Sequence, residues 1–76
     1  MKEDDLMMPL ILAEEGQDNM IRKVSGSPEI KQHLEDMGFV PGTSVTVVTK
    51  NPGNVIVNVK NVRIGLSREL AQKIMI

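Results

Sequence analysis

The chain of 76 residues has no cysteine, no tryptophan and no tyrosine, and it has one phenylalanine, Phe39. The lack of cysteine excludes disulfides, thiolate metal ligands and a thiol nucleophile, and it fits a reducing cytoplasm. The lack of aromatic side chains removes the surfaces on which bases stack, so recognition of nucleic acid by an aromatic sheet is not expected.

Long apolar runs are also missing. The stretch from Leu6 to Ala13 is the main apolar run near the N-terminus; it is interrupted by Pro9 and is far too short to span a bilayer. Residues 2–5 (KEDD) are mostly acidic, where a signal peptide has basic residues. The sequence therefore predicts a cytoplasmic protein without direct membrane insertion.

Charge is divided unevenly along the chain. Residues 1–18 carry a net charge of −5, and residues 19–76 carry +4. A mildly basic body suits an acidic protein surface or the cytoplasmic face of a membrane better than tight DNA binding, although a mixed solvated surface explains it too. We expect residues 1–8 to form a disordered acidic leader and residues 9–76 to form one domain, because this length allows a single core.

A helix is predicted after Ser27. Ser27 is a good N-cap, Pro28 fits the first helical position, and Ile30, Leu34 and Met37 recur at helical spacing. A glycine follows at position 38 and ends the helix, since it adopts a left-handed conformation without strain.

Strands are predicted on both sides of this helix. Residues 20–24 form a short strand, and residues 45–66 alternate apolar and polar side chains in three strands with turns at 51–54 and 60–61. Ser67 caps a last short helix, and residues 74–76 form a strand that pairs with an early one. The predicted fold is mainly β, a small closed barrel of about five strands with one or two short helices, since closure removes exposed strand edges.

Three stretches resemble the FeoA family, and they are Gly16–Gly26 (GQDNMIRKVSG), Leu34–Val48 (LEDMGFVPGTSVTVV) and Val62–Ile76 (VRIGLSRELAQKIMI). The most specific part follows the family's pattern of helix end, Met-Gly-apolar, Pro-Gly and alternating strand: Leu34, Met37, Gly38, Phe39, Pro41, Gly42, Val45 and Val47.

The resemblance implies that the barrel is SH3-like and that the domain accompanies FeoB, the GTPase-containing membrane transporter of bacterial ferrous iron uptake. It also implies a link to transition-metal binding. Two positions depart from the family pattern. Gln32 and His33 stand where relatives often have basic residues, and Ser67 stands where they often have arginine. Partner contacts made by those basic residues do not carry over to this chain.

Candidate partner-binding residues lie between the helix and the next strand. Phe39 is either a core residue under the helix or an exposed apolar contact, and the scarcity of aromatics favours the core. Should it be exposed, Phe39 and Val40 would form an apolar anchor, with Pro41 holding the corner rigid. The residues with structural roles in this motif are Leu34, Met37, Gly38 and Gly42.

The sequence contains no convincing catalytic or metal-ligating cluster. His33 is the only histidine, and although it could approach Asp36 on the helix, it has no second histidine to share a metal. Met20, Met37 and Met75 fall at expected core positions, so core filling is favoured over metal ligation. Serines lie at turns and caps without a histidine and an orienting acid, so we expect neither an enzyme nor a bound cofactor.

Three functions remain open. The first is a protein-binding accessory module that acts on a FeoB-like transporter. The second is a detached SH3-like domain that partners a metal-dependent transcriptional repressor. The third is an RNA- or ribosome-associated SH3-like barrel, which the lack of a Lys/Arg cluster disfavours.

Titration of ferrous iron into the purified protein under anaerobic conditions is expected to give no saturable stoichiometric site. Hard and borderline metals require several converging oxygen or nitrogen ligands, and the sequence offers no such set. A saturable site that disappears on His33→Ala would contradict this expectation.

Overall fold

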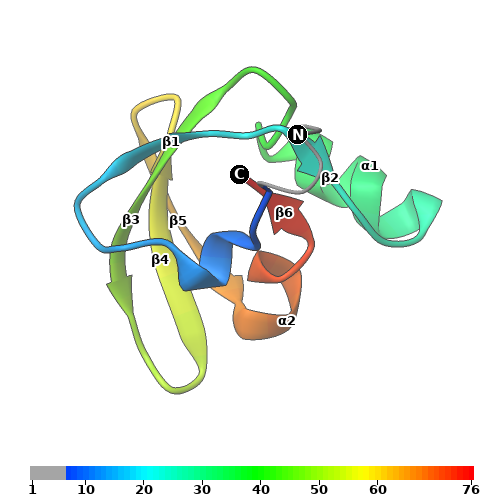
Figure 1. The fold of residues 1–76 in the computed structure, drawn as a ribbon. Coiled ribbons are helices and arrows are strands. Elements are labelled where there is room, and N and C mark those ends of the chain that lie inside the picture. The colour runs from blue at the N-terminus through cyan, green and yellow to red at the C-terminus, as the bar shows by residue number, and fades with distance from the viewer. Residues whose placement is uncertain (1–6) are drawn as a thin grey trace.

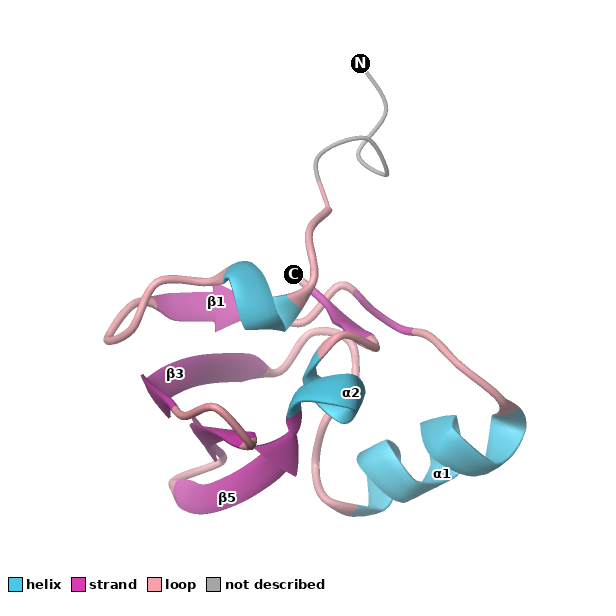
Figure 2. Ribbon diagram, turned by 90° about the horizontal axis from the view of Figure 1, so that it is seen from below, coloured by secondary structure: helices cyan, strands magenta, loops and turns pink. Residues whose placement is uncertain are grey.

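The computed structural model describes residues 7–76, which form two small antiparallel sheets with short helices around them (Figures 1 and 2). The four-stranded sheet has the order β1-β3-β4-β5, with β1 at Asp18–Met20, β3 at Ser44–Lys50, β4 at Asn54–Val59 and β5 at Val62–Ser67. The second sheet pairs β2 (Lys23–Val24) with β6 (Ile74–Met75). The helices are a 3-10 turn η2 (Leu10–Leu12), α1 (Pro28–Asp36) and α2 (Arg68–Ala71). The expected mainly β fold is confirmed.

The chain passes from one sheet to the other at Ile21. β1 pairs with β3 and β2 pairs with β6, so the single strand expected over residues 20–24 is in fact divided between two sheets. Ile21 donates its N–H to the carbonyl of Thr43 at 2.9 Å and accepts from the N–H of Gly42 at 2.8 Å, and Arg22 donates to Met75 at 2.8 Å. Backbone pairing therefore continues across the junction without a gap.

The meander of β3, β4 and β5 matches the alternation in the sequence. Its inward-facing side chains are fully buried, namely those of Val45, Val47, Val55, Val57, Val59 and Leu66. The turn between β4 and β5 consists of Lys60 and Asn61, both with positive φ, as a two-residue turn of type I′ requires. One irregularity, a register shift between Val47 and Thr49, interrupts the β3–β4 ladder.

Helix α1 begins and ends as predicted. The Ser27 side chain accepts from the N–H of Ile30 at 3.2 Å, and Pro28 is the first helical residue. At the other end, Gly38 has φ of +103°, its N–H bonds the carbonyl of Glu35 at 2.9 Å, and the N–H of Phe39 bonds the carbonyl of Leu34 at 2.9 Å. This is a Schellman motif, in which the residue after the glycine packs back on the last helical turn.

Phe39 lies in the core. Its side chain is 0% exposed and belongs to the same buried cluster as Leu34, so the favoured interpretation of the sequence is confirmed. Phe39 is among the largest fully buried side chains, which makes it a major part of the core beneath α1.

The C-terminal segment closes the fold. Ser67 caps α2 through a 3.1 Å bond from the N–H of Leu70, and β6 pairs with β2 as the sequence predicted. Met8 and Ile76 exchange two backbone bonds, of 3.0 and 2.8 Å. Of the predicted disordered leader, residues 1–6 lie outside the described residues. Met8, at its end, is paired with Ile76.

Two apolar residues are more exposed than the sequence indicated. Met20, expected in the core, is 62% exposed, and Leu12, which lies in the apolar run of residues 6–13, is 64% exposed. Met20 ends β1 on the outer face of the sheet, opposite Ser44. Leu10 and Ile11 of the same run are buried, and Met37 packs against the core as expected. Within the described range, no helix is long and apolar enough to cross a membrane.

Substitution of Gly42 by valine is expected to lower the free energy of unfolding by about 1–3 kcal/mol, because a β-branched residue is strained at positive φ. Gly42 has φ of +92°, and no atom lies within 4 Å of the Cβ position, so the backbone alone causes the cost. Gly53 is the matched control, since its site is equally open and its φ lies outside the left-handed region. Equal losses for Gly42→Val and Gly53→Val in urea unfolding would contradict the prediction.

Substitution of Phe39 by leucine is expected to cost about 1–3 kcal/mol in the same measurement, because it leaves a cavity in a fully packed core. Leu12→Ala removes a large apolar side chain at an exposed position and should change stability by less than about 0.5 kcal/mol. Unchanged unfolding of Phe39→Leu would show that Phe39 is not a core residue in solution.

Candidate functional site

The outer face of the four-stranded sheet carries a row of polar side chains. The register places Asp18 of β1 opposite Thr46 of β3, Thr46 opposite Asn58 of β4, and Asn58 opposite Arg63 of β5. The Thr46 hydroxyl donates a hydrogen bond to the Asp18 carboxylate. The row thus runs from an acidic group on one edge strand to a basic group on the other.

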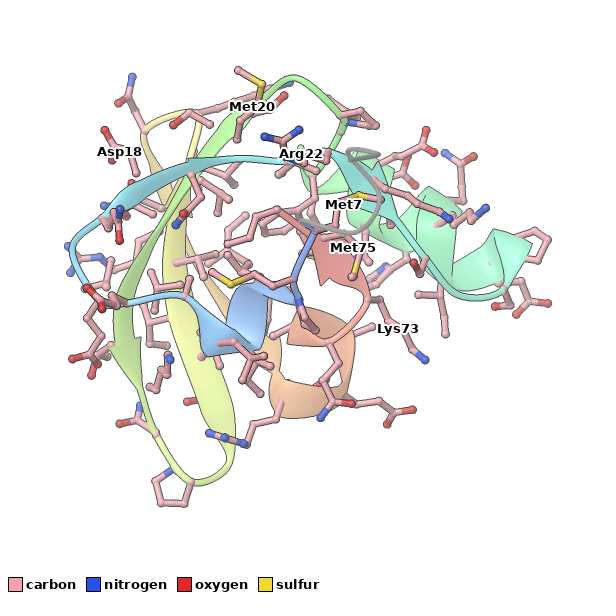
Figure 3. All side chains as sticks on the ribbon, in the orientation of Figure 1. Met7, Asp18, Met20, Arg22, Lys73 and Met75 are labelled. Carbon is pink, nitrogen blue, oxygen red and sulfur yellow. The ribbon has the colours of Figure 1, made fainter. Side chains whose placement is uncertain are left out.

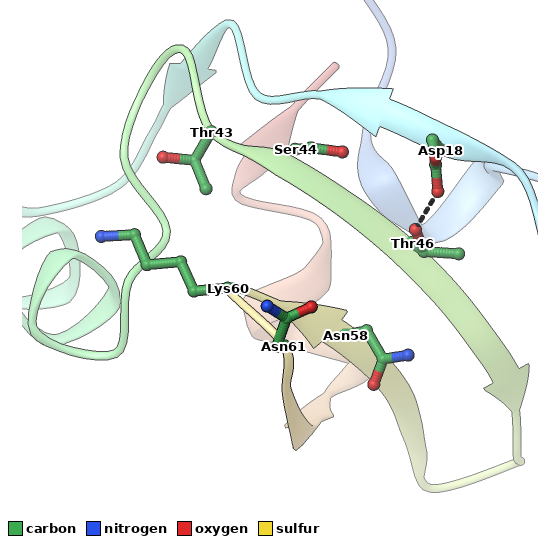
Figure 4. Close-up of a pocket in the computed structure, with 7 residues that line it drawn as sticks. All are labelled: Asp18, Thr43, Ser44, Thr46, Asn58, Lys60 and Asn61. Atoms are coloured by element: carbon green, nitrogen blue, oxygen red, sulfur yellow. Dashed lines mark hydrogen bonds between the residues drawn. The ribbon is translucent and has the colours of Figure 1, made fainter.

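A shallow polar depression of about 430 Å³ lies on this face (Figure 4). Its walls offer hydroxyl and amide groups with one carboxylate and one ammonium: Asp18, Thr43, Ser44, Thr46, Asn58, Lys60 and Asn61. Figure 4 shows Asp18 and Lys60 at opposite ends. Such a surface can form hydrogen bonds with a polar partner, but its serine and threonines have no histidine beside them to act as a base.

Lys60 links this depression to the end of α1. A Cβ atom on Gly38 would stand 3.6 Å from Lys60 Cδ, so the lysine methylenes cover the glycine at the helix terminus. The lysine charge is therefore held beside the C-terminal end of α1, where the helix dipole favours a cation.

The helix-to-strand corner separates the three predicted partner-binding residues. Phe39 is buried and cannot serve as an exposed anchor, Val40 is half-buried, and Pro41 is exposed. The corner is held by bonds from Thr43 to the carbonyl of Val40 at 3.1 Å and from Gly42 to that of Ile21 at 2.8 Å. Val40 and Pro41 remain available for contact, whereas Phe39 supports them from below.

The structural motif of the sequence holds together around the same corner. Leu34 is fully buried, Met37 is half-buried against the core, and Gly38 and Gly42 both have positive φ. Each glycine thus occupies a conformation that side chains disfavour.

The helix surface does not assemble the His33–Asp36 contact that the sequence allowed. Asp36 instead accepts a 2.8 Å hydrogen bond from the side-chain amide of Gln32, one turn earlier. Among residues 7–76, no group of three or more histidine, cysteine or acidic side chains could hold a metal ion.

The exposure of Met20 was not foreseen from the sequence. Figure 3 shows Met7, Met20 and Met75 along the side of the molecule where β2 and β6 lie, together with Arg22 and Lys73. Of these, Met20 is the clearly exposed methionine. Its exposure could have been anticipated from Asp18, since residues two apart on a strand share a face.

Comparison with known proteins gives one family and three informative relatives. The FeoA domain family matches residues 8–76. The "Putative Fe(2+) transport protein A" of Methanocaldococcus jannaschii is 34% identical over 70 residues, covering 92% of this chain and 85% of that protein. A crystal structure of an iron uptake regulatory protein, FeoA, superposes with a TM-score of 0.84 at 27% identity, covering 91% of this chain and 93% of the other.

A manganese-dependent transcriptional repressor also superposes with a TM-score of 0.84, at 16% identity. The match covers 92% of this chain and 40% of the repressor chain, and it shows a likeness of fold alone. The arrangement of the two sheets is that of an SH3-like domain. Since the family match spans residues 8–76 and extends through every described helix and strand, this chain belongs to the FeoA domain family.

Proposed function

We propose that this chain is a cytosolic accessory protein of ferrous iron uptake that binds a FeoB-like, GTPase-containing membrane transporter and acts through that contact. The observation that carries the proposal is the FeoA family match over residues 8–76, supported by a 34%-identical relative whose name refers to Fe(2+) transport.

The distribution of side chains supports a binding role. The inward-facing apolar residues of the meander and the buried residues of α1 and α2 belong to one core, and the outer sheet face is a hydrogen-bonding surface. In small domains of this kind, function resides in the exposed surface that the scaffold supports.

Charge supports encounter with an acidic partner. Residues 19–76 carry a net charge of +4. A basic body raises the rate of association with an acidic protein surface near the inner leaflet, where anionic lipids lie, while contributing less to affinity.

A role beside a metal-dependent repressor is the second candidate. The likeness to 40% of a manganese-dependent repressor favours it, because the same fold occurs there as part of a longer chain. At 16% identity the match shows a likeness of fold alone, so this candidate ranks second.

Affinity purification of the tagged chain from cells that contain a FeoB-like transporter is expected to recover the transporter from membranes solubilised in mild detergent. The experiment is run with GDP and with a non-hydrolysable GTP analogue, since the partner contains a GTPase domain. Capture of a helix-turn-helix repressor from the soluble fraction, with no transporter in either nucleotide state, would favour the second candidate.

The control is the destabilised Gly42→Val chain carrying the same tag. Its folded fraction is lowered while its outer-face side chains are unchanged, so recovery should fall with the folded fraction. Recovery that is independent of folding would mark the capture as non-specific.

A further inference from the structure

Strand β5 has one unpaired edge. β5 lies at the end of the order β1-β3-β4-β5 and pairs only with β4. Among the described residues, no backbone hydrogen bond outside the sheet ladders involves residues 62–67. Figure 2 shows β5 at the margin of the sheet, with no strand beyond it.

The register defines which backbone groups face outward. Val59 and Val62 flank the two-residue turn directly opposite each other. In a ladder closed by such a turn, the flanking residues bond across the ladder, and every second residue directs its N–H and C=O away. Arg63 and Gly65 therefore present their N–H and C=O groups at the open edge, and both residues are exposed.

The other edge of the same sheet is protected and β5 is not. β1 has three residues, and shortness is one of the devices that prevent an edge from pairing with another chain. β5 has six residues, contains no proline and has a regular register with β4 throughout.

Gly65 makes the edge of β5 accessible. Its φ lies outside the left-handed region, and a Cβ would meet only Ile56 Cδ1, the end of a flexible side chain, at 3.4 Å. Neither backbone conformation nor crowding therefore requires glycine here. Glycine in the interior of a strand often marks a place where another backbone approaches closely.

The positive charge beside the β5 edge favours an acidic segment as the strand that pairs with it. The β4–β5 hairpin, residues 54–67, contains Lys60 and Arg63 and no acidic residue. Pairing with a second copy of β5 would bring two such hairpins together, and like charges on adjacent strands are destabilising. An acidic segment forms opposite-charge pairs instead.

We propose that the free edge of β5 binds an extended acidic segment of a partner protein by strand addition. The backbone groups of Arg63 and Gly65 pair with the segment, and the side chain of Arg63 contacts its carboxylates. If the segment belongs to the transporter, the inference rests on the proposed function and names the surface that docking uses.

The test uses the full chain labelled with ¹⁵N and an octapeptide of alternating threonine and glutamate, with a threonine–lysine octapeptide as its matched control. The glutamate peptide is expected to give saturable NMR shifts and slowed hydrogen exchange at the amides of Arg63 and Gly65, with the amide of Met20, which faces away from β3 on the opposite edge, unchanged. The lysine peptide should bind roughly tenfold more weakly, because its charges are repelled by the hairpin.

Two variants separate charge from backbone pairing. Arg63→Glu leaves the hairpin without net charge and should remove the preference between the two peptides, whereas Lys31→Glu, a charge reversal on exposed α1, should not. Gly65→Pro removes an outward N–H and should weaken both peptides. Melting curves of all three variants show whether they fold. If Gly65→Pro does not fold, the unchanged chain is tested with a glutamate peptide N-methylated at alternate residues. Failure of that peptide to bind supports strand addition.

Several results would overturn the inference. Equal binding of both peptides would exclude selection by charge. Shifts confined to Thr46 and Asn58 would place the peptide in the depression and not at β5. A concentration-dependent dimer that protects the Arg63 and Gly65 amides without peptide would show that a second copy occupies the edge. Transporter recovery that is unaffected by Gly65→Pro in a folded chain would place docking elsewhere and leave the proposed function standing. Peptide binding without transporter recovery would contradict the proposed function and leave strand addition at β5 standing.

Discussion

The backbone bonds around Ile21 are the constraint on which the remaining structure depends. Ile21 is bonded to Thr43 and Gly42 through both of its backbone groups, and Arg22 next to it is bonded to Met75. The same short segment therefore joins the four-stranded sheet to the two-stranded one. Because the Ile21 side chain is only 1% exposed, any shift of this junction would also disturb the core.

The end of α1 is fixed from three directions by this arrangement. The Schellman motif turns Phe39 back under Leu34, the Lys60 methylenes cover Gly38, and Gly42 bonds Ile21. Helix, hairpin turn and sheet junction thus share one small region. This explains how a family pattern of a few residues can specify a corner that involves three segments distant in sequence.

Local features could be predicted from the sequence because their causes are local. The caps at Ser27 and Ser67, the turn at residues 60–61 and the alternation of residues 45–66 all follow from neighbouring residues. The division of residues 20–24 between two sheets, the exposure of Met20 and the open edge of β5 depend on strand order and register, which involve residues far apart in sequence. The scarcity of aromatic residues in the chain favoured a buried Phe39. Only the structure, in which the side chain is 0% exposed, excludes Phe39 as an exposed anchor.

The paired ends of the domain have a practical consequence for protein engineering. Met8 and Ile76 exchange two backbone hydrogen bonds, so chain entering and chain leaving the domain lie side by side. Domains with adjacent ends are readily inserted into a loop of another protein or circularly permuted. A short linker could join residue 76 to residue 8, and new chain ends could be opened at the exposed turn of residues 51–53. The result would be a circularly permuted domain whose ends lie at the β3–β4 turn.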